Sequence, residues 1–168
     1  MAETAAEEVI VRTELQASFR AAMGNVAAPV AVVTTHAGGV PHGTTVSAFA
    51  SLSMTPPMLL VSLQHASHLL SLLDVGTRFG VNVLAAHQSA LASRFATRGP
   101  DKFTDVPWVL NDGAPALLDT HAWVALRVAR LVRAGDHTLV LGDVVNARTG
   151  HEAPLTYHRR SFGTHLAH

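Results

Sequence analysis

The feature that most constrains the fold is a pair of β-type segments in the C-terminal half, separated by a turn. Residues 122–129 alternate between two sets of side chains, as a strand with two different faces does. Residues 138–145 form a second run rich in leucine and valine, and Ala134-Gly135-Asp136 lies between the two. Glycine and aspartate favour turns, so the two runs predict an antiparallel hairpin.

Shorter segments of the same character precede this hairpin. Residues 30–35, 43–49, 58–63 and 79–84 are predicted as strands, with turn signals between them. Helices are few. Three are predicted: residues 14–23 behind a capping box of Thr13 and Gln16, a short helix capped by Ser67 and closed by Gly76, and residues 87–97.

Many short strands with few helices between them favour a mainly β fold, an antiparallel barrel with flanking helices, over a doubly wound sheet. The chain has no GxGxxG after a strand and no P-loop, so a nucleotide would have to bind without a Rossmann or Walker motif. We see no internal repeat and no linker. The expected organisation is a flexible N-terminal lead over residues 1–12 and a single domain over residues 13–168.

Composition excludes several classes of protein. Lys+Arg and Asp+Glu both number 12, so nothing steers the chain to nucleic acid or to an anionic membrane. Cysteine is absent, which excludes disulfides, thiolate nucleophiles and zinc–thiolate sites. The N-terminus does not read as a signal peptide, and we expect a cytoplasmic protein. A positive mean hydropathy suggests apolar surface covered by a second copy.

Small polar residues are concentrated in one predicted strand and just after it, over Thr44–Ala48 and at Ser51 and Ser53. Small side chains let a planar ligand approach the backbone, and their hydroxyl and N–H groups can bond its polar edge. The alternative is a sheet edge whose hydroxyls face water. Ser67, at a predicted helix start, either binds a phosphate or acts as a plain N-cap.

Histidine, arginine and lysine supply the other candidates. His137 follows the Gly135-Asp136 turn and can contact a substrate, or it is simply a turn neighbour. Arg159 and Arg160 beside Tyr157 either meet an anion or form a solvated tail, and the same choice applies to Lys102-Phe103.

The 11 histidines show no metal-ligand spacing. His65 and His68 are three residues apart with no acid nearby, and HExxH is absent, so we expect no metal. A Ser–His–acid hydrolase lacks its GxSxG elbow. A metal-dependent hydrolase stays open as an alternative, to be tested by metal analysis.

In their order, these signals resemble the flavin reductase-like family, the FMN-binding split-barrel reductases of two-component monooxygenases. The resemblance extends from about Phe19 to Phe162. The landmarks that carry it are Phe19-Arg20 with Met23-Gly24, residues 30–35, Gly43–Phe49, Ser51-Leu52-Ser53 with Pro56-Pro57, Phe79–Leu84, Gln88 with Leu91-Ala92 and Phe95, Lys102-Phe103, Gly135–Thr138, and Pro154-Leu155 with Tyr157.

The resemblance implies a Greek-key split barrel, a homodimer and a partner oxygenase that receives reduced flavin. It implies FMN or FAD together with NADH or NADPH, with His137 positioning the nicotinamide without acting as an essential base. Asn82 would face the flavin, and Tyr157 and Arg160 would close the pocket. The cofactor-binding residues it implies are Thr44, Thr45, Val46, Ser47, Ala48, Ser51, Leu52, Ser53, Ser62, Leu63, Ser67, His68, Asn82, Lys102, Phe103, Tyr157 and Arg160.

The chain departs from the family pattern at two places. Arg127 stands where the family often has a small residue or cysteine, and the predicted phosphate loop Gln64–His68 offers only histidines where a basic residue is usual. Hydride transfer needs no nucleophile, because the cofactor carries the chemistry. The alternative from another class is a protein of this fold that retains its flavin, either as a binding protein or as an oxidase.

Overall fold

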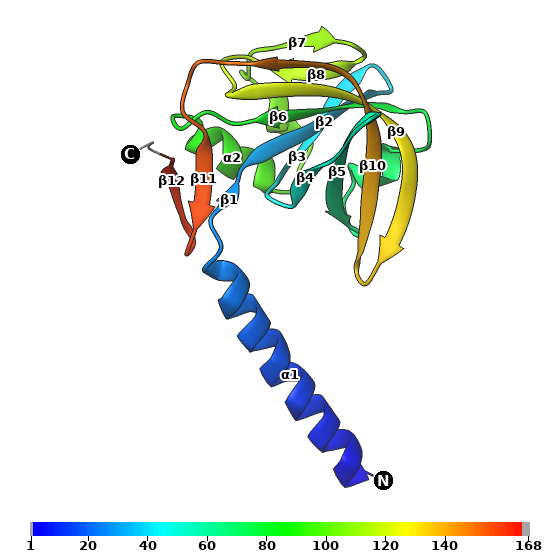
Figure 1. The fold of residues 1–168 in the computed structure, drawn as a ribbon, viewed down its shortest axis with the longest axis vertical. Helices are drawn as coiled ribbons and strands as arrows, with labels where there is room; N and C mark the ends of the chain where they lie inside the picture. Colours follow the sequence, from blue (N-terminus) through cyan, green and yellow to red (C-terminus); the bar gives the residue numbers. More distant parts are fainter. Residues whose placement is uncertain (1, 166–168) are drawn as a thin grey trace.

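The structure is a computed structural model that describes residues 2–165, with side chains from Val11 onward. The chain is built mainly from antiparallel strands, with one long N-terminal helix and a short helix beside the sheet (Figure 1). The elements are α1 Ala2–Gly24, β1 Ala28–Pro29, β2 Ala31–Ala37, β3 Val40–Val46, β4 Phe49–Met54, β5 Pro57–Gln64, the 3-10 helix η1 Leu70–Leu72, β6 Arg78–Val83, α2 Ser89–Ala96, the 3-10 helix η2 Asp101–Phe103, β7 Trp108–Asn111, β8 Ala114–Leu117, β9 Ala122–Ala134, β10 His137–Thr149, β11 Leu155–His158 and β12 Ser161–Thr164.

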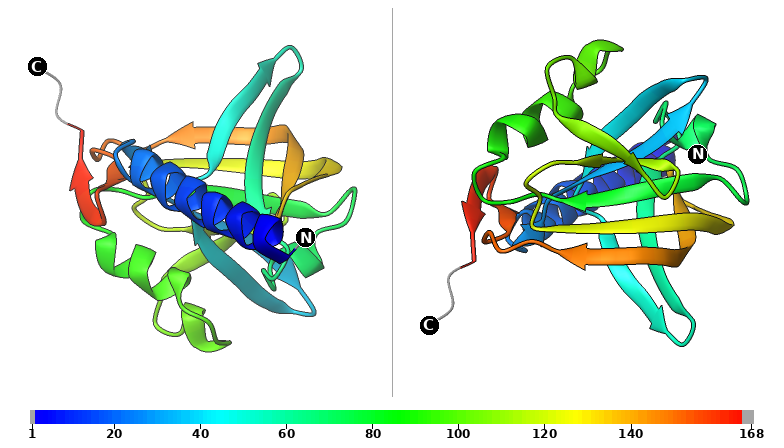
Figure 2. Two further views of the ribbon diagram at one scale, coloured as in Figure 1. Left: turned by 90° about the horizontal axis from the view of Figure 1, so that it is seen from below. Right: turned by 90° about the horizontal axis from the view of Figure 1, so that it is seen from above.

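One seven-stranded sheet, in the order β3-β2-β6-β9-β10-β5-β4, forms the body of the protein. Its central pair is the predicted hairpin, with Ala134 opposite His137 across the turn. The two edge strands β3 and β4 are joined only by Ser47 and Ala48. The chain therefore passes directly from one edge of the sheet to the other, and the β2–β3 and β4–β5 hairpins point away from each other (Figure 2). This makes an open barrel with a split between β3 and β4.

The core lies on both faces of β2. Ala31 and Val33 point into the barrel, where they pack with Phe79, Val81 and other buried side chains. Val32 belongs to a second buried cluster that includes Ala92 and Phe95 of α2. Because side chains alternate along a strand, β2 is apolar on both faces and reads as a continuous buried run.

A buried polar network fixes the β7–β8 hairpin against this sheet. Asn82 is fully buried, and its Nδ2 donates to Val32 O at 3.0 Å and to Thr34 Oγ1 at 3.2 Å. Its Oδ1 accepts the backbone N–H of Leu117 at 2.7 Å, and Thr34 Oγ1 donates to Pro115 O at 2.6 Å. The side chain thus satisfies backbone groups on two strands that do not pair with each other.

The N-terminal helix differs from the prediction. A helix was expected over residues 14–23 behind a flexible lead, but α1 begins at Ala2 and continues to Gly24. Thr13 therefore lies within the helix and does not cap it, and the expected domain boundary after residue 12 falls inside the helix. Figure 1 shows α1 projecting from the β structure. Within residues 2–165, no helix is both long and apolar enough to span a membrane.

Two other predictions are corrected. The segment 43–49 is not one strand, because β3 ends at Val46 and β4 begins at Phe49. Ser67 does not cap a helix: the leucine-rich segment forms only η1, whose N-cap is Leu69. In the tail, β11 pairs with both β1 and β12, and residues 157–164 are exposed.

Candidate active site

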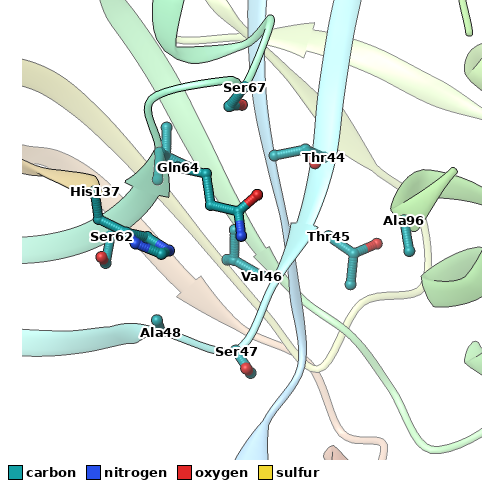
Figure 3. Close-up of a pocket in the computed structure, with 11 residues that line it drawn as sticks. Thr44, Thr45, Val46, Ser47, Ala48, Ser62, Gln64, Ser67, Ala96 and His137 are labelled. Atoms are coloured by element: carbon teal, nitrogen blue, oxygen red, sulfur yellow. The ribbon is translucent and has the colours of Figure 1, made fainter. Parts of the chain in front are cut away.

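A cavity of about 340 Å³ lies beside the split of the barrel (Figure 3). Edge strand β3 and the β3–β4 connection form one side, and β5 and the first residue of β10 form the other. The end of α2 closes a third side. The lining residues are Thr44, Thr45, Val46, Ser47, Ala48, Ser62, Leu63, Gln64, Ser67, Ala96 and His137.

Pairing of β5 with β10 brings His137 to the cavity. In that register His137 is opposite Gln64, and Leu139 is opposite Ser62. The backbone N–H of Ser62 donates to Ala48 O at 2.8 Å, which ties the β3–β4 connection to β5. Residues that are far apart in sequence are thus placed around the cavity by backbone hydrogen bonds of the sheet.

Among the described strands β3 pairs with β2 alone, and contacts with α2 and with Lys102 hold it in place. The hydroxyl of Thr45 donates to Ala92 O of α2 at 2.6 Å. Lys102 Nζ donates to Gly43 O at 3.2 Å and to Phe95 O at 3.0 Å, and burial lowers the pKa of its ammonium. A Cβ on Gly43 would lie 2.8 Å from Phe95 Cε1, so glycine allows this close packing.

The lining contains no lysine, arginine, aspartate or glutamate. Its polar groups are hydroxyls, one amide and the imidazole of His137. Outside the cavity, His137 Nδ1 lies 2.7 Å from Asp136 Oδ1. The hydrogen bond and the positive charge of His137 lower the pKa of the Asp136 carboxyl. The carboxylate sets which nitrogen of the ring can face the cavity, because it engages Nδ1 and leaves Nε2 for a ligand.

This lining fits the planar, largely uncharged ring system of a flavin. The cavity volume falls in the range of small-molecule sites, roughly 300–1,000 Å³. Val46 and Ala48 offer apolar contact area, and Ser47 and Ser62 offer hydroxyl groups for the polar edge of a ring. No pair of carboxylates or activated serine is present among the lining residues, so the arrangement is suited to binding and orienting ligands.

Nine of the residues predicted to form the site meet at this cavity: Thr44, Thr45, Val46, Ser47, Ala48, Ser62, Leu63, Ser67 and His137. Gln64 and Ala96 complete the lining; Gln64 was predicted only as part of the phosphate loop Gln64–His68, and Ala96 was not predicted. Gln64 directly follows Leu63 in β5, so extending the predicted strand by one residue would have found it. Ala96 carries no chemical signal, because it reaches the cavity only through the packing of α2 against β3.

Other predicted residues lie outside the lining. Ser51, Leu52 and Ser53 lie on β4, and His68 follows Ser67 with its ring beside His42. Phe103 packs edge-on against Phe95 at 4.8 Å.

Tyr157 and Arg160 belong to the β11–β12 hairpin and do not close the cavity within this chain. Tyr157 packs against Phe162 at 5.2 Å, and Arg160 occupies the turn with a φ of 64°. Figure 1 shows this hairpin on the side of the β structure away from the turn between β9 and β10.

The expectation that Asn82 faces a flavin is corrected, because its side chain is fully buried among backbone groups of β2 and β8. Arg127 is on the surface of β9, with Nη2 3.7 Å from Asp143 Oδ2. It does not line the cavity. Among the residues described, no three His, Asp or Glu side chains come together as metal ligands would.

An open antiparallel barrel with an uncharged, hydroxyl-lined cavity beside its split defines a ligand-binding β protein. Residues 23–165 match the family model described as flavin reductase like domain. The chain therefore belongs to the flavin reductase-like family, and its fold is the FMN-binding split barrel.

Named relatives agree with this assignment. The chain is 38% identical over 148 residues to the reductase component of a 4-nitrophenol 4-monooxygenase/4-nitrocatechol 2-monooxygenase from Rhodococcus opacus, covering 88% of this chain and 80% of that protein. It is 40% identical over 152 residues to an NADH:riboflavin 5'-phosphate oxidoreductase from Streptomyces pristinaespiralis, covering 88% and 86%. The solved NADH:FAD oxidoreductase of Streptomyces globisporus superposes with a TM-score of 0.84 at 30% identity, covering 90% and 94%.

Proposed function

We propose that this protein is an NAD(P)H-dependent flavin reductase that transfers hydride to FMN or FAD. The observation that carries the proposal is the cavity between β3 and β5, with its small uncharged lining and a single imidazole at the start of β10. The named relatives use the same chemistry: one is an NADH:riboflavin 5'-phosphate oxidoreductase, and another is a flavin reductase that uses NADPH.

The residues of the cavity bind and orient, while a bound flavin supplies the hydride-accepting ring. Backbone groups of Thr45–Ala48 and the hydroxyl of Ser47 bond the polar edge of the ring, and Ser67 contributes a hydroxyl towards the phosphate end. His137, with Nδ1 engaged by Asp136, directs Nε2 towards the nicotinamide. No step in this scheme requires a nucleophile or a strong general acid from the protein.

The proposal includes a setting for the protein. We take residues 13–168 as a single domain in the cytoplasm that hands reduced flavin to a partner oxygenase. Relatives named as reductase components of a nitrophenol monooxygenase and a tryptophan halogenase support such a partner.

A homodimer is also part of the proposal. Its support is the apolar stripe of α1, formed by Val11, Leu15, Phe19 and Met23 at four-residue spacing, whose side chains are 51–68% exposed in the single chain.

The function is tested by following oxidation of NADH and NADPH with FMN, FAD and riboflavin supplied in turn. A reductase oxidises the nicotinamide only when a flavin is added, and it loses its flavin on dialysis. Purified protein that stays yellow on dialysis and oxidises no nicotinamide with added flavin would instead be a flavin-retaining binding protein or an oxidase.

The role of His137 has its own test. Because His137→Ala removes a group that positions the nicotinamide, it is expected to raise the KM for NADH more than it lowers kcat. His151→Gln, a substitution at an exposed histidine of the β10–β11 connection, is the matched control. A large fall in kcat at unchanged KM would contradict this role.

A further inference from the structure

A second cavity, of about 280 Å³, lies at the far end of the β structure from the site described above. It is formed by β7 and β8, the connection from β8 to β9, and the end of β10. Figure 1 shows the β7–β8 hairpin at the end of the β structure away from the turn between β9 and β10. His137 of the first cavity and Arg148 of the second are eleven residues apart in β10, about 35 Å along the strand. The two cavities are therefore separate sites within one chain.

One side of the second cavity is an apolar wall. The side chains of Leu117 and Trp123 are buried, and those of Val109 and Leu118 are partly exposed at the rim. The indole of Trp123 is packed across β6, where only a glycine at position 80 leaves room for it, so the ring is held in one place. The volume is just below the range of roughly 300–1,000 Å³ for sites of drug-sized ligands. This wall suits a flat ligand with a single ring.

The indole nitrogen of Trp123 is a donor without an acceptor. It is fully buried, and within residues 11–165 it is the one buried side-chain nitrogen or oxygen that lacks a hydrogen bond. Buried polar groups are nearly always paired, because an unpaired donor loses its hydrogen bond to water and gains nothing in return. An acceptor at this nitrogen must therefore come from a bound molecule, since the chain supplies none.

Arg148 is the second unpaired donor. It lies directly opposite Trp123 in the register of β9 and β10, so both side chains are on the same face of the sheet. Its guanidinium is exposed and forms neither a hydrogen bond nor an ion pair with any residue of the described side chains, 11–165. A free guanidinium presents a planar fork of N–H groups that matches the two oxygens of a carboxylate.

Acidic groups around the cavity limit the charge of the ligand. Asp119 belongs to the lining and is exposed, in the turn before β9 with a φ of 58°. It does not pair with Arg148, so the two opposite charges are both left for a ligand or for water. The nearby carboxylate of Asp112 accepts a hydrogen bond from Asn146 Nδ2 at 3.0 Å. One free cation beside one free acid favours a ligand with a single negative charge over one with several.

We propose that this second cavity binds a small aromatic carboxylate. The ring of the ligand packs against the apolar wall, and its carboxylate accepts hydrogen bonds from the Arg148 guanidinium. The ligand also supplies the acceptor that Trp123 Nε1 lacks. This site goes beyond the proposed flavin reductase function and does not depend on it, because none of its residues lines the first cavity.

The test compares benzoate with benzamide, which has the same ring and nearly the same shape but no charge. Dissociation constants are measured by calorimetric titration at neutral pH, with and without saturating FMN. The variants are Arg148→Gln and Trp123→Phe, and the matched control is Arg130→Gln, at an exposed arginine of β9 outside the lining. The wild type is expected to bind benzoate with a Kd of about 1 mM or tighter, and benzamide about tenfold more weakly.

Each variant has its own expected result. Arg148→Gln should raise the Kd for benzoate about tenfold and leave the Kd for benzamide unchanged, whereas Arg130→Gln should change neither. Trp123→Phe should weaken both ligands, since both carry an oxygen acceptor. A variant that does not require a change at the site is Trp108→Phe, which leaves Trp123 as the single tryptophan. Its fluorescence should change on titration with benzoate, with the Kd found by calorimetry.

Equal affinity for benzoate and benzamide, or an equal effect of Arg148→Gln and Arg130→Gln on benzoate, would overturn the proposal. So would an absence of benzoate binding, or an unchanged Trp123 fluorescence at saturating benzoate. Loss of benzoate binding in the presence of FMN would place benzoate in the first cavity and would also overturn it. Because the titrations contain no nicotinamide, their outcome is independent of whether the protein reduces flavins.

Discussion

Replacing Asn82 with alanine removes the side chain that joins β6 to β2 and β8 inside the protein. The change leaves the backbone N–H of Leu117 buried without its 2.7 Å acceptor, and it deprives Val32 O and Thr34 Oγ1 of a donor. One orphaned buried N–H costs about 1–3 kcal/mol, and the lost bonds and the small cavity add to this. We expect a loss in the free energy of unfolding of about 3 kcal/mol.

Thermal and urea denaturation measure this loss. For a chain of this size, about 3 kcal/mol corresponds to a fall in Tm of roughly 6–12 °C. The matched control is Asn146→Ala, which removes an exposed amide that donates to Asp112 Oδ2 at 3.0 Å. Its cost should stay below about 0.5–1 kcal/mol, since both groups are open to water.

The same variant separates a structural role for Asn82 from a flavin-binding role. The structure predicts that the folded fraction of Asn82→Ala binds FMN with an affinity within a few-fold of the wild type. A variant of unchanged Tm that binds FMN more than about tenfold more weakly would refute the reasoning, because it would place Asn82 at the ligand.

Two further predictions concern packing and charge. A Cβ on Gly80 would lie 1.9 Å from Cη2 of Trp123, whose side chain is fully buried. Gly80→Ala should therefore lower the free energy of unfolding, measured by urea denaturation, by about 3 kcal/mol or more. An unchanged urea midpoint would contradict this packing. Because His137 lowers the pKa of Asp136, the pair stabilises the fold above the ordinary pKa of aspartate, and this contribution is lost as the pH falls through the lowered value. The Tm difference between wild type and Asp136→Asn should accordingly shrink on acidification, and a difference that grows would show the opposite sign.

The parts of the fold that sequence predicts well are those held by local pattern. The β9–β10 hairpin follows from alternation over residues 122–129 and a Gly-Asp turn, and both signals are local. The β7–β8 hairpin was not predicted, because its strands are short, β8 contains Pro115, and its position depends on bonds from Asn82. A contact between segments that are distant in sequence produces no periodic pattern of apolar residues in either segment.

Two helix predictions were wrong, the start of the N-terminal helix and the helix after Ser67, and each has an identifiable reason. Residues 2–12 are rich in alanine and glutamate, which are good helix formers, yet their acidity was interpreted as a flexible lead. The leucines after Ser67 have helical spacing, but Leu69 and Leu73 are buried in the barrel core and only one 3-10 turn forms between them. The conformation of this segment is therefore set by the packing of Leu69 and Leu73, and not by helix propensity.

The part of the candidate site that is rich in small polar residues could be predicted from the sequence. Residues whose role depends on which face of a strand their side chain occupies could not. Thr44–Ala48 stand out by composition, and they line the cavity. Asn82 was assigned to the wrong face because β6 is buried on both sides, so alternation does not reveal which side meets the ligand. The contact of the Asp136 carboxylate with His137 Nδ1 is between two side chains, and spacing along the sequence alone does not specify it.

The most direct test of the proposed function is anaerobic reduction of FMN by NADH in the presence of the purified protein, followed as bleaching of the flavin absorbance. The account predicts rapid bleaching with the wild type. It also predicts a large loss of rate for Ala48→Phe, which fills the cavity beside Ser47 while leaving the barrel core intact. No bleaching above the rate of the uncatalysed mixture with the wild type, or an unimpaired rate in a folded Ala48→Phe variant, would contradict it.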